Sequence, residues 1–158
     1  MKRGGWFANI LIGVLAAAVL AVGLYKFFFQ EQPLAPFRFD GFEKITVSDL
    51  DGSVLPLSGL AAEDGMTYCL IFEISDCPSC IFKGIEDLKR LKQAGKAYIP
   101  LLVHDLIDEV RGWSASNNFF PLYMLSKVDF YEHVHTPITP VMIKIKKNRV
   151  ESYRYITP

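Results

Sequence analysis

The sequence predicts an α/β domain with a mixed central β-sheet flanked by helices, preceded by a single N-terminal transmembrane helix. Apolar runs of strand length alternate with segments of helical periodicity, which is the pattern of such a sheet. The chain has 158 residues, a length typical of one domain, and 51% of them are hydrophobic. The formal net charge is zero and no basic stripe is present, so we expect no nucleic-acid partner.

The transmembrane prediction rests on residues 6–29, most of which are apolar. About 20 helical residues cover the ~30 Å hydrocarbon core of a bilayer. Lys2 and Arg3 precede the segment, and positive charge favours the cytoplasmic side. We therefore expect residues 1–5 to form a cytoplasmic tail and the rest of the chain to follow on the far side of the membrane.

Two other interpretations of this apolar segment stay open. Small residues such as those at 16–18 would suit cleavage as a signal peptide, and a buried helix of a soluble protein is the other alternative. After the segment, Pro33 and Pro36 indicate an extended linker over residues 30–38. Residues 39–158 are then the globular domain.

The domain begins with a predicted β-hairpin. Residues 42–47 alternate in the manner of a strand, Asp51 and Gly52 signal a turn, and residues 53–57 form the returning strand. Residues 66–74 are a near-continuous apolar run rich in strand formers. Such a run is typical of a central strand that is buried on both faces.

A helix is predicted to begin at Pro78 and to end near Gly95. Its apolar face would carry residues at helical spacing, namely Ile81, Phe82, Ile85, Leu88 and Leu91. Residues 97–103 form a second apolar strand. Residues 106–117 then favour a helix, with Asp105 as a candidate N-cap.

The C-terminal third predicts three more strands and one short helix. We expect a strand at residues 122–125, a helix at 127–134, and a hairpin made of strands 141–146 and 150–155. Asn148 lies in the turn of this hairpin, and asparagine tolerates the left-handed conformation that tight hairpin turns need.

Cys77 and Cys80 form a C-x-x-C pair where the strand at 66–74 gives way to the next helix. Cys77 would stand at the helix N-terminus, where free N–H groups and the helix dipole favour a thiolate. Cys80 would lie one turn inside, close enough to close a disulfide, and Pro78 suits the first helical turn because it has no N–H to lose. We therefore predict that Cys77 is the nucleophile and Cys80 the resolving thiol.

Other uses of the cysteines are weaker. A zinc site needs four ligands, and only His133 and His135 are available to complete the pair, so we expect no metal. An inert disulfide across so short a loop would remove little chain entropy. The third cysteine, Cys69, is read as a small buried hydrophobic residue, with a redox role as the alternative.

Three segments in the right order resemble the thioredoxin superfamily. Residues 68–80 resemble its strand–CxxC–helix, and residues 49–58 resemble the hairpin of its TlpA-like and peroxiredoxin-like branches. Residues 138–145 resemble the cis-proline segment and the strand that follows it. The chain over about residues 38–158 therefore resembles the TlpA-like, redoxin-type, membrane-anchored thiol-disulfide oxidoreductases.

The resemblance implies a thioredoxin-like fold on a bacterial cytoplasmic (inner) membrane, with the domain facing the periplasm or the exterior. It implies that Pro140 is the cis-proline and that the backbone of Thr139 receives an extended substrate chain, with Pro137 as the alternative cis position. The last helix of the family has no counterpart before Pro158. One face of the sheet is therefore expected to be open or covered by a partner.

The chain departs from the family pattern beside the cysteines. Asp76 replaces the usual tryptophan, and its carboxylate is expected to raise the pKa of Cys77. Ile71 occupies the place of the family's buried acid. Glu73, on the same face of the strand, is a candidate proton acceptor for Cys80, while an exposed or ion-paired Glu73 is the other interpretation.

The predicted function is thiol-disulfide exchange with exported proteins, using a redox partner protein and no cofactor. Reduction is favoured over oxidation because no histidine lies between the two cysteines. A thiol peroxidase is one alternative. Peroxiredoxins usually place Thr or Ser three residues before the reactive cysteine, and Ile74 at that position argues against this alternative. A non-enzymatic module, such as a metallochaperone or an assembly subunit, is the other.

Overall fold

The computed structural model describes residues 37–62 and 65–158, which belong to one compact unit that extends from Ala35 to Pro158. This unit includes the last residues of the predicted linker. The predicted transmembrane segment at residues 6–29 lies outside the described residues. Within the described part of the chain, no helix is long and apolar enough to cross a membrane.

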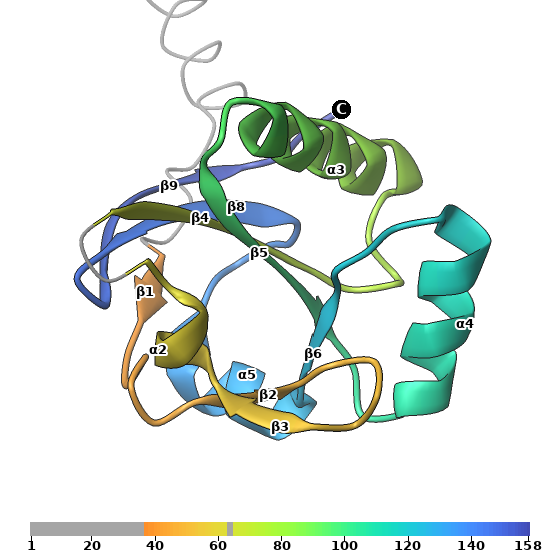
Figure 1. The fold of residues 1–158 in the computed structure, drawn as a ribbon, viewed down its shortest axis with the longest axis horizontal. Coiled ribbons are helices and arrows are strands. Elements are labelled where there is room, and N and C mark those ends of the chain that lie inside the picture. Colours follow the sequence, from red (N-terminus) through yellow and green to blue (C-terminus); the bar gives the residue numbers. More distant parts are fainter. Residues whose placement is uncertain (1–36, 63–64) are drawn as a thin grey trace, which may run out of the picture. The chain divides into compact units, whose positions relative to one another are not determined.

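A seven-stranded mixed sheet forms the centre of the unit, in the order β3-β2-β6-β5-β4-β8-β9 (Figure 1). Its strands are β2 (Thr46–Ser48), β3 (Val54–Pro56), β4 (Met66–Phe72), β5 (Ala97–Val103), β6 (Tyr123–Leu125), β8 (Val141–Lys146) and β9 (Arg149–Tyr155). The pairs β4–β5 and β5–β6 are parallel, whereas β4–β8 and β8–β9 are antiparallel. The predicted α/β class with a mixed sheet is therefore confirmed.

Four helices and a second small sheet complete the described residues. The helices are α2 (Leu57–Leu60), α3 (Pro78–Gln93), α4 (Ile107–Asn117) and α5 (Lys127–His133). The small sheet pairs β1 (Arg38–Phe39) with β7 (Val134–His135) in antiparallel fashion. α3 follows β4 directly, as the sequence predicted, so the cysteine pair lies just after the end of the central strand.

The central strands are buried on both faces because side chains alternate along them. On β4, Leu70 and Phe72 join the core beneath α3 and α4, whereas Cys69 and Ile71 join the core on the other face. That second face is covered by residues from the N-terminal segment, α2 and α5, namely Phe37, Phe42, Ile45, Leu57 and Phe130. Figure 1 shows the same division, with α3 and α4 apart from α2 and α5.

No helix follows β9 among the residues that the structure describes. Instead Ile156, which is 4% exposed, packs into the core beneath α3. A groove of about 430 Å³ remains beside α3 over β8 and β9, lined by apolar and charged side chains that include Tyr68, Met142 and Arg154. The region left without a final helix therefore carries this groove.

The first predicted strand, at residues 42–47, is wrong at its start. β2 covers only Thr46–Ser48, and residues 42–44 form a turn. Gly41 has a φ of +69°, a conformation that favours glycine, and Lys44 N–H donates to the Gly41 carbonyl at 2.7 Å. Phe42 is buried from within the turn, so its apolar character reflected packing rather than a strand.

Asp105 does not cap α4 as predicted. The N-cap position is taken by Leu106 without a side-chain hydrogen bond. The Asp105 carboxylate instead accepts a hydrogen bond from Lys127 N–H at 2.9 Å, which links it to the start of α5. His104 supplies the local contact, because its Nδ1 accepts from Leu106 N–H at 3.0 Å.

The remaining differences are small. Phe82 is 52% exposed rather than part of the apolar face of α3, because it lies one residue, or about 100° of helix, beyond buried Ile81. Other predicted strands and helices shift by one or two residues, as at β4, β3, α5 and β9. The C-terminal hairpin turn holds Lys147 and Asn148 at φ of +48° and +58°, which confirms the left-handed turn.

Candidate functional site

The two cysteines of the C-x-x-C pair sit at the start of α3, as the sequence predicted. Cys77 is the N-cap residue and Pro78 the first residue of the helix. Cys77 is exposed and Cys80 is buried. Cys77 C=O accepts hydrogen bonds from the N–H groups of Cys80 at 2.9 Å and of Ile81 at 3.0 Å, which places the pair in the first helical turn.

The pKa of Cys77 is lowered from 9.0 to about 7. Its side-chain hydrogen bond with Cys80 is the largest cause, followed by the hydroxyl of Ser79, whose Oγ lies 3.0 Å from Cys77 Sγ. Backbone N–H groups of the first turn lower it further. We expected Asp76 to raise this pKa; the net shift is downward because of these hydrogen bonds, and Asp76 is not among its causes, so its effect on Cys77 stays a prediction.

The pKa of Cys80 moves in the opposite direction. The hydrogen bond with Cys77 raises it most, burial raises it further, and the charge of Asp76 also contributes. A shared hydrogen bond can stabilise only one thiolate at a time, so a lowered pKa at one sulfur accompanies a raised pKa at the other. The two shifts therefore favour a thiolate at the exposed Cys77 and a protonated thiol at the buried Cys80.

Asp76 accepts hydrogen bonds at both carboxylate oxygens, one from each of two different segments. Its Oδ2 accepts a hydrogen bond from Glu73 N–H at 2.8 Å, and its own N–H donates to the Glu73 carbonyl at 3.1 Å. Its Oδ1 accepts a hydrogen bond from the Thr139 hydroxyl at 2.6 Å. Asp76 therefore closes the turn between β4 and α3 and also joins that turn to a distant loop.

The loop that Asp76 reaches contains the predicted cis-proline segment. The Thr139–Pro140 peptide bond is cis, whereas Pro137 is not among the cis prolines of the described chain. The buried Pro140 accepts a hydrogen bond at its carbonyl from Ile156 N–H at 2.9 Å. The Phe120–Pro121 bond is also cis, and no feature of the sequence predicted it.

Among the described residues, no hydrogen bond joins the other candidates to the cysteine pair. No hydrogen bond or ion pair joins the Glu73 side chain to another described residue. Cys69 is fully buried within β4, and burial raises its pKa strongly. His135, considered above as a zinc ligand, lies near Asp40, with 3.5 Å between His135 Nε2 and Asp40 Oδ2. Among the described residues, no group of three or more His, Cys, Asp or Glu is placed to hold a metal.

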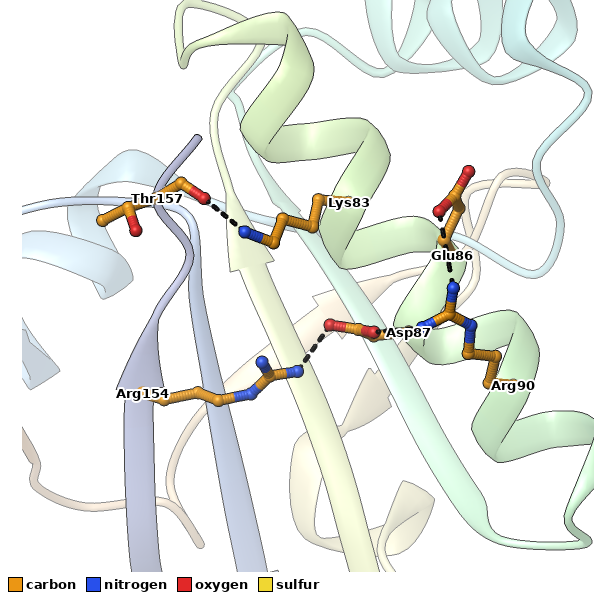
Figure 2. A network of polar contacts seen from close by, with 6 residues as sticks. All are labelled: Lys83, Glu86, Asp87, Arg90, Arg154 and Thr157. Carbon is orange, nitrogen blue, oxygen red and sulfur yellow. Dashed lines mark hydrogen bonds and ion pairs between the residues drawn. The ribbon is translucent and has the colours of Figure 1, made fainter.

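A polar network holds α3 against the end of the chain (Figure 2). Arg154 on β9 donates to the Asp87 carboxylate at 2.5 Å, and Lys83 Nζ donates to the Thr157 carbonyl at 2.9 Å. Arg90 lies 3.7 Å from Asp87 on the same helix. Figure 2 shows Arg154 and Lys83 reaching between α3 and the C-terminal segment, whereas Glu86 and Arg90 both lie on α3. The network therefore links the helix that carries the cysteines to β9 and to the residues after it.

Two features of the site were missed in the sequence. The first is Ser79, a hydroxyl inside the C-x-x-C motif, whose spacing from Cys77 is the only available signal. The second is the contact between Asp76 and Thr139, which are 63 residues apart and carry no local sign of their pairing.

No family model matches the sequence, and no curated protein matches it. Solved structures do match. A thiol:disulfide interchange protein from Bacteroides sp. has a TM-score of 0.57 and 13% identity, covering 76% of this chain and 78% of that one. A secreted disulfide oxidoreductase from Mycobacterium tuberculosis, described as homologous to DsbE of E. coli, has a TM-score of 0.55 and 14% identity, covering 75% and 87%.

A putative thioredoxin from Neisseria meningitidis has a TM-score of 0.51 and 22% identity, covering 72% of this chain and 77% of that one. The sequence identities are low, so the likeness concerns the fold. The described domain has a thioredoxin-like fold, with Cys77 and Cys80 close together at the start of α3.

Proposed function

We propose that this protein is a thiol-disulfide oxidoreductase in which Cys77 is the attacking thiolate and Cys80 the resolving thiol. The observation that carries the proposal is the asymmetry of the pair at the start of α3. The exposed Cys77 has a pKa near 7, so about half of it is thiolate at neutral pH, whereas the pKa of the buried Cys80 is raised. The exposed Cys77 sulfur is therefore suited to attack a target disulfide, and the buried Cys80 sulfur to resolve the mixed disulfide.

The exchange proceeds in two displacements. Cys77 Sγ forms a bond to one sulfur of a target disulfide, and the other target sulfur leaves as a thiolate. Cys80 then loses its proton to solvent or to the departing thiolate, and its Sγ attacks Cys77 Sγ. The products are a Cys77–Cys80 disulfide and a reduced target dithiol, so two electrons have moved to the target.

Protein disulfides are the proposed substrates. Ile74, Phe82 and Ile138 are exposed apolar side chains, and each lies within three residues of Cys77, Cys80 or Pro140 along the chain. Apolar side chains beside a reactive group favour binding of another chain. The backbone at Thr139 is the proposed contact for an extended substrate segment.

Reduction is the proposed direction, with a dithiol protein as the donor that resets the pair. Peroxidase activity gains no support at the site, since Ile74 offers no hydroxyl three residues before Cys77.

The sequence supports a location for this activity. Residues 6–29 are proposed to anchor the protein in the cytoplasmic membrane with the domain outside, and one structural neighbour is described as secreted. A membrane-impermeant maleimide added to intact cells should then label Cys77, and a Cys77→Ser variant should remain unlabelled. Labelling of Cys77 only after lysis would contradict the proposed location.

The exchange itself is tested by trapping. In Cys80→Ser, the mixed disulfide formed with glutathione disulfide should persist on Cys77 and be seen by mass spectrometry. The wild-type protein should release it and form its internal disulfide, while Cys77→Ser should form no adduct at pH 7. An equal yield of adduct on Cys77→Ser would overturn the assignment of Cys77 as the nucleophile.

A further inference from the structure

Asp76 uses both carboxylate oxygens to connect two loops of the site. Oδ2 receives Glu73 N–H at 2.8 Å, which closes the turn that begins the cysteine segment. Oδ1 receives the Thr139 hydroxyl at 2.6 Å from across the sheet edge. Both residues of this second bond are half-buried, so water competes less for it than at a fully exposed site.

The bond joins the immediate neighbours of two functional positions. Asp76 precedes Cys77, and Thr139 precedes the cis Pro140. The far side of the proline loop is fixed separately, by Ile156 N–H donating to the Pro140 carbonyl at 2.9 Å. The distance between the nucleophile and the substrate-binding backbone is therefore set on one side by a single carboxylate–hydroxyl pair.

The Asp76 carboxylate is also uncompensated. Both hydrogen-bond donors to it are neutral, and no Lys, Arg or His pairs with it in the described part of the chain. Its negative charge belongs to the residue directly before Cys77, and it raises the pKa of Cys80, which shares a hydrogen bond with Cys77. The reduced pair at neutral pH carries a thiolate, whereas the disulfide carries no charge, so a nearby anion disfavours the reduced state relative to the disulfide.

We propose that Asp76 is a positioning residue that holds the Cys77 loop against the Thr139–Pro140 loop, and that its charge makes the cysteine pair more strongly reducing. This inference rests on the proposed function and deepens it. The disulfide accepts two electrons and, for full protonation, two protons to become the dithiol. Removing the charge stabilises the thiolate and makes the disulfide easier to reduce.

The charge is tested by equilibrating the full-length protein with glutathione buffers. Asp76→Asn keeps the shape and one of the two accepting oxygens but removes the charge. Glu73→Gln is the matched control, since Glu73 is an acid three residues from Asp76 whose side chain has no hydrogen bond or ion pair with another described residue. Asp76→Asn should shift the equilibrium toward the dithiol at least threefold, which corresponds to about 14 mV for two electrons. Glu73→Gln should leave it unchanged.

The positioning is tested by kinetics on a disulfide-bonded protein substrate. Thr139→Val removes the hydroxyl but keeps the branched shape and the Asp76 charge, and should lower kcat/KM several-fold with a smaller change in potential than Asp76→Asn. Thr139→Ser, which restores the hydroxyl, should recover most of the activity. Circular dichroism tests whether each variant is folded. If Asp76→Asn does not fold, Asp76→Ser serves as a second neutral variant.

The outcomes separate this inference from the proposed function. A neutral variant of Asp76 with the potential of Glu73→Gln would overturn the role of the charge. Thr139→Val with wild-type kcat/KM would overturn the positioning role. If the wild-type protein itself shows no reversible disulfide, the proposed function fails, whereas a reversible wild-type couple with unchanged variants refutes only the role of Asp76.

Discussion

Cys80→Ala should raise the pKa of Cys77, because the hydrogen bond with Cys80 is the largest of the causes that lower it from 9.0 to about 7. Ser79 and the backbone N–H groups stay in place, so the pKa rises toward 9.0 without reaching it. Cys80→Ser keeps a hydroxyl that can donate to the Cys77 thiolate. It is therefore the matched control, and its Cys77 pKa should stay closer to that of the wild type.

The size of the effect follows from the two pKa limits. At pH 7, a thiol of pKa about 7 is about one half thiolate, and one of pKa 9.0 is about one hundredth thiolate. The thiolate of lower pKa is intrinsically about 6- to 10-fold less nucleophilic over two units. The net rate advantage of wild-type Cys77 at pH 7 is therefore about 5- to 8-fold, which is the largest loss that Cys80→Ala should show.

The assay is the rate of reaction of the reduced protein with iodoacetamide between pH 5 and 10. The wild-type rate should titrate near pH 7 and the Cys80→Ala rate at higher pH. Above pH 9 the order should reverse, because the more basic thiolate is then the better nucleophile. A wild-type midpoint near 9, or equal midpoints for wild type and Cys80→Ala, would refute the role given to Cys80.

Four further variants test stability, measured by urea unfolding of the full-length protein. A Cβ at Gly84 would lie 2.9 Å from Ile156 Cδ1 and from Leu70 Cδ1, so Gly84→Ala should lower the free energy of unfolding by about 1 kcal/mol despite its better helix propensity. Gly112→Ala, with open space around the new methyl group, should instead raise it by up to about 1 kcal/mol, and equal effects at the two glycines would contradict the packing argument. Ser114→Ala removes the buried hydroxyl that donates to the Phe119 carbonyl at 2.6 Å and should lower it by about 1–3 kcal/mol, whereas no loss would mean that the bond is unimportant. Asp87→Asn should lower it by less than about 1 kcal/mol, with a smaller difference in 1 M salt, because its partner Arg154 is 56% exposed, and a larger salt-independent loss would argue against a surface ion pair.

The elements that carry the cysteines were predictable because local signals agreed there. The apolar run that became β4, the Pro78 at the helix start and the glycine at position 95, with a φ of +67°, each point to the same strand and helix. The placement of Cys77 at an exposed helix start and of Cys80 one turn inside followed from their spacing alone.

The features that were not predictable depend on distant partners. Phe42 packs into the core although it lies in a turn, and the turn depends on the positive φ at Gly41, which the sequence pattern does not show. Asp105 has the right residue type for an N-cap but finds its donor at Lys127. The hydrogen bond between Asp76 and Thr139 was missed for the same reason, because the two residues lie 63 positions apart in the sequence.

The most direct test of the central claim is the reduction potential of the Cys77–Cys80 pair in the full-length protein, equilibrated with glutathione and dithiothreitol buffers. The account predicts one reversible two-electron couple, at a potential below about −200 mV, which is the range of thioredoxin-like and glutaredoxin-like reductants. A value near −120 mV would mean that the protein donates disulfides and would contradict the proposed direction. The absence of any reversible couple would contradict the proposed function itself.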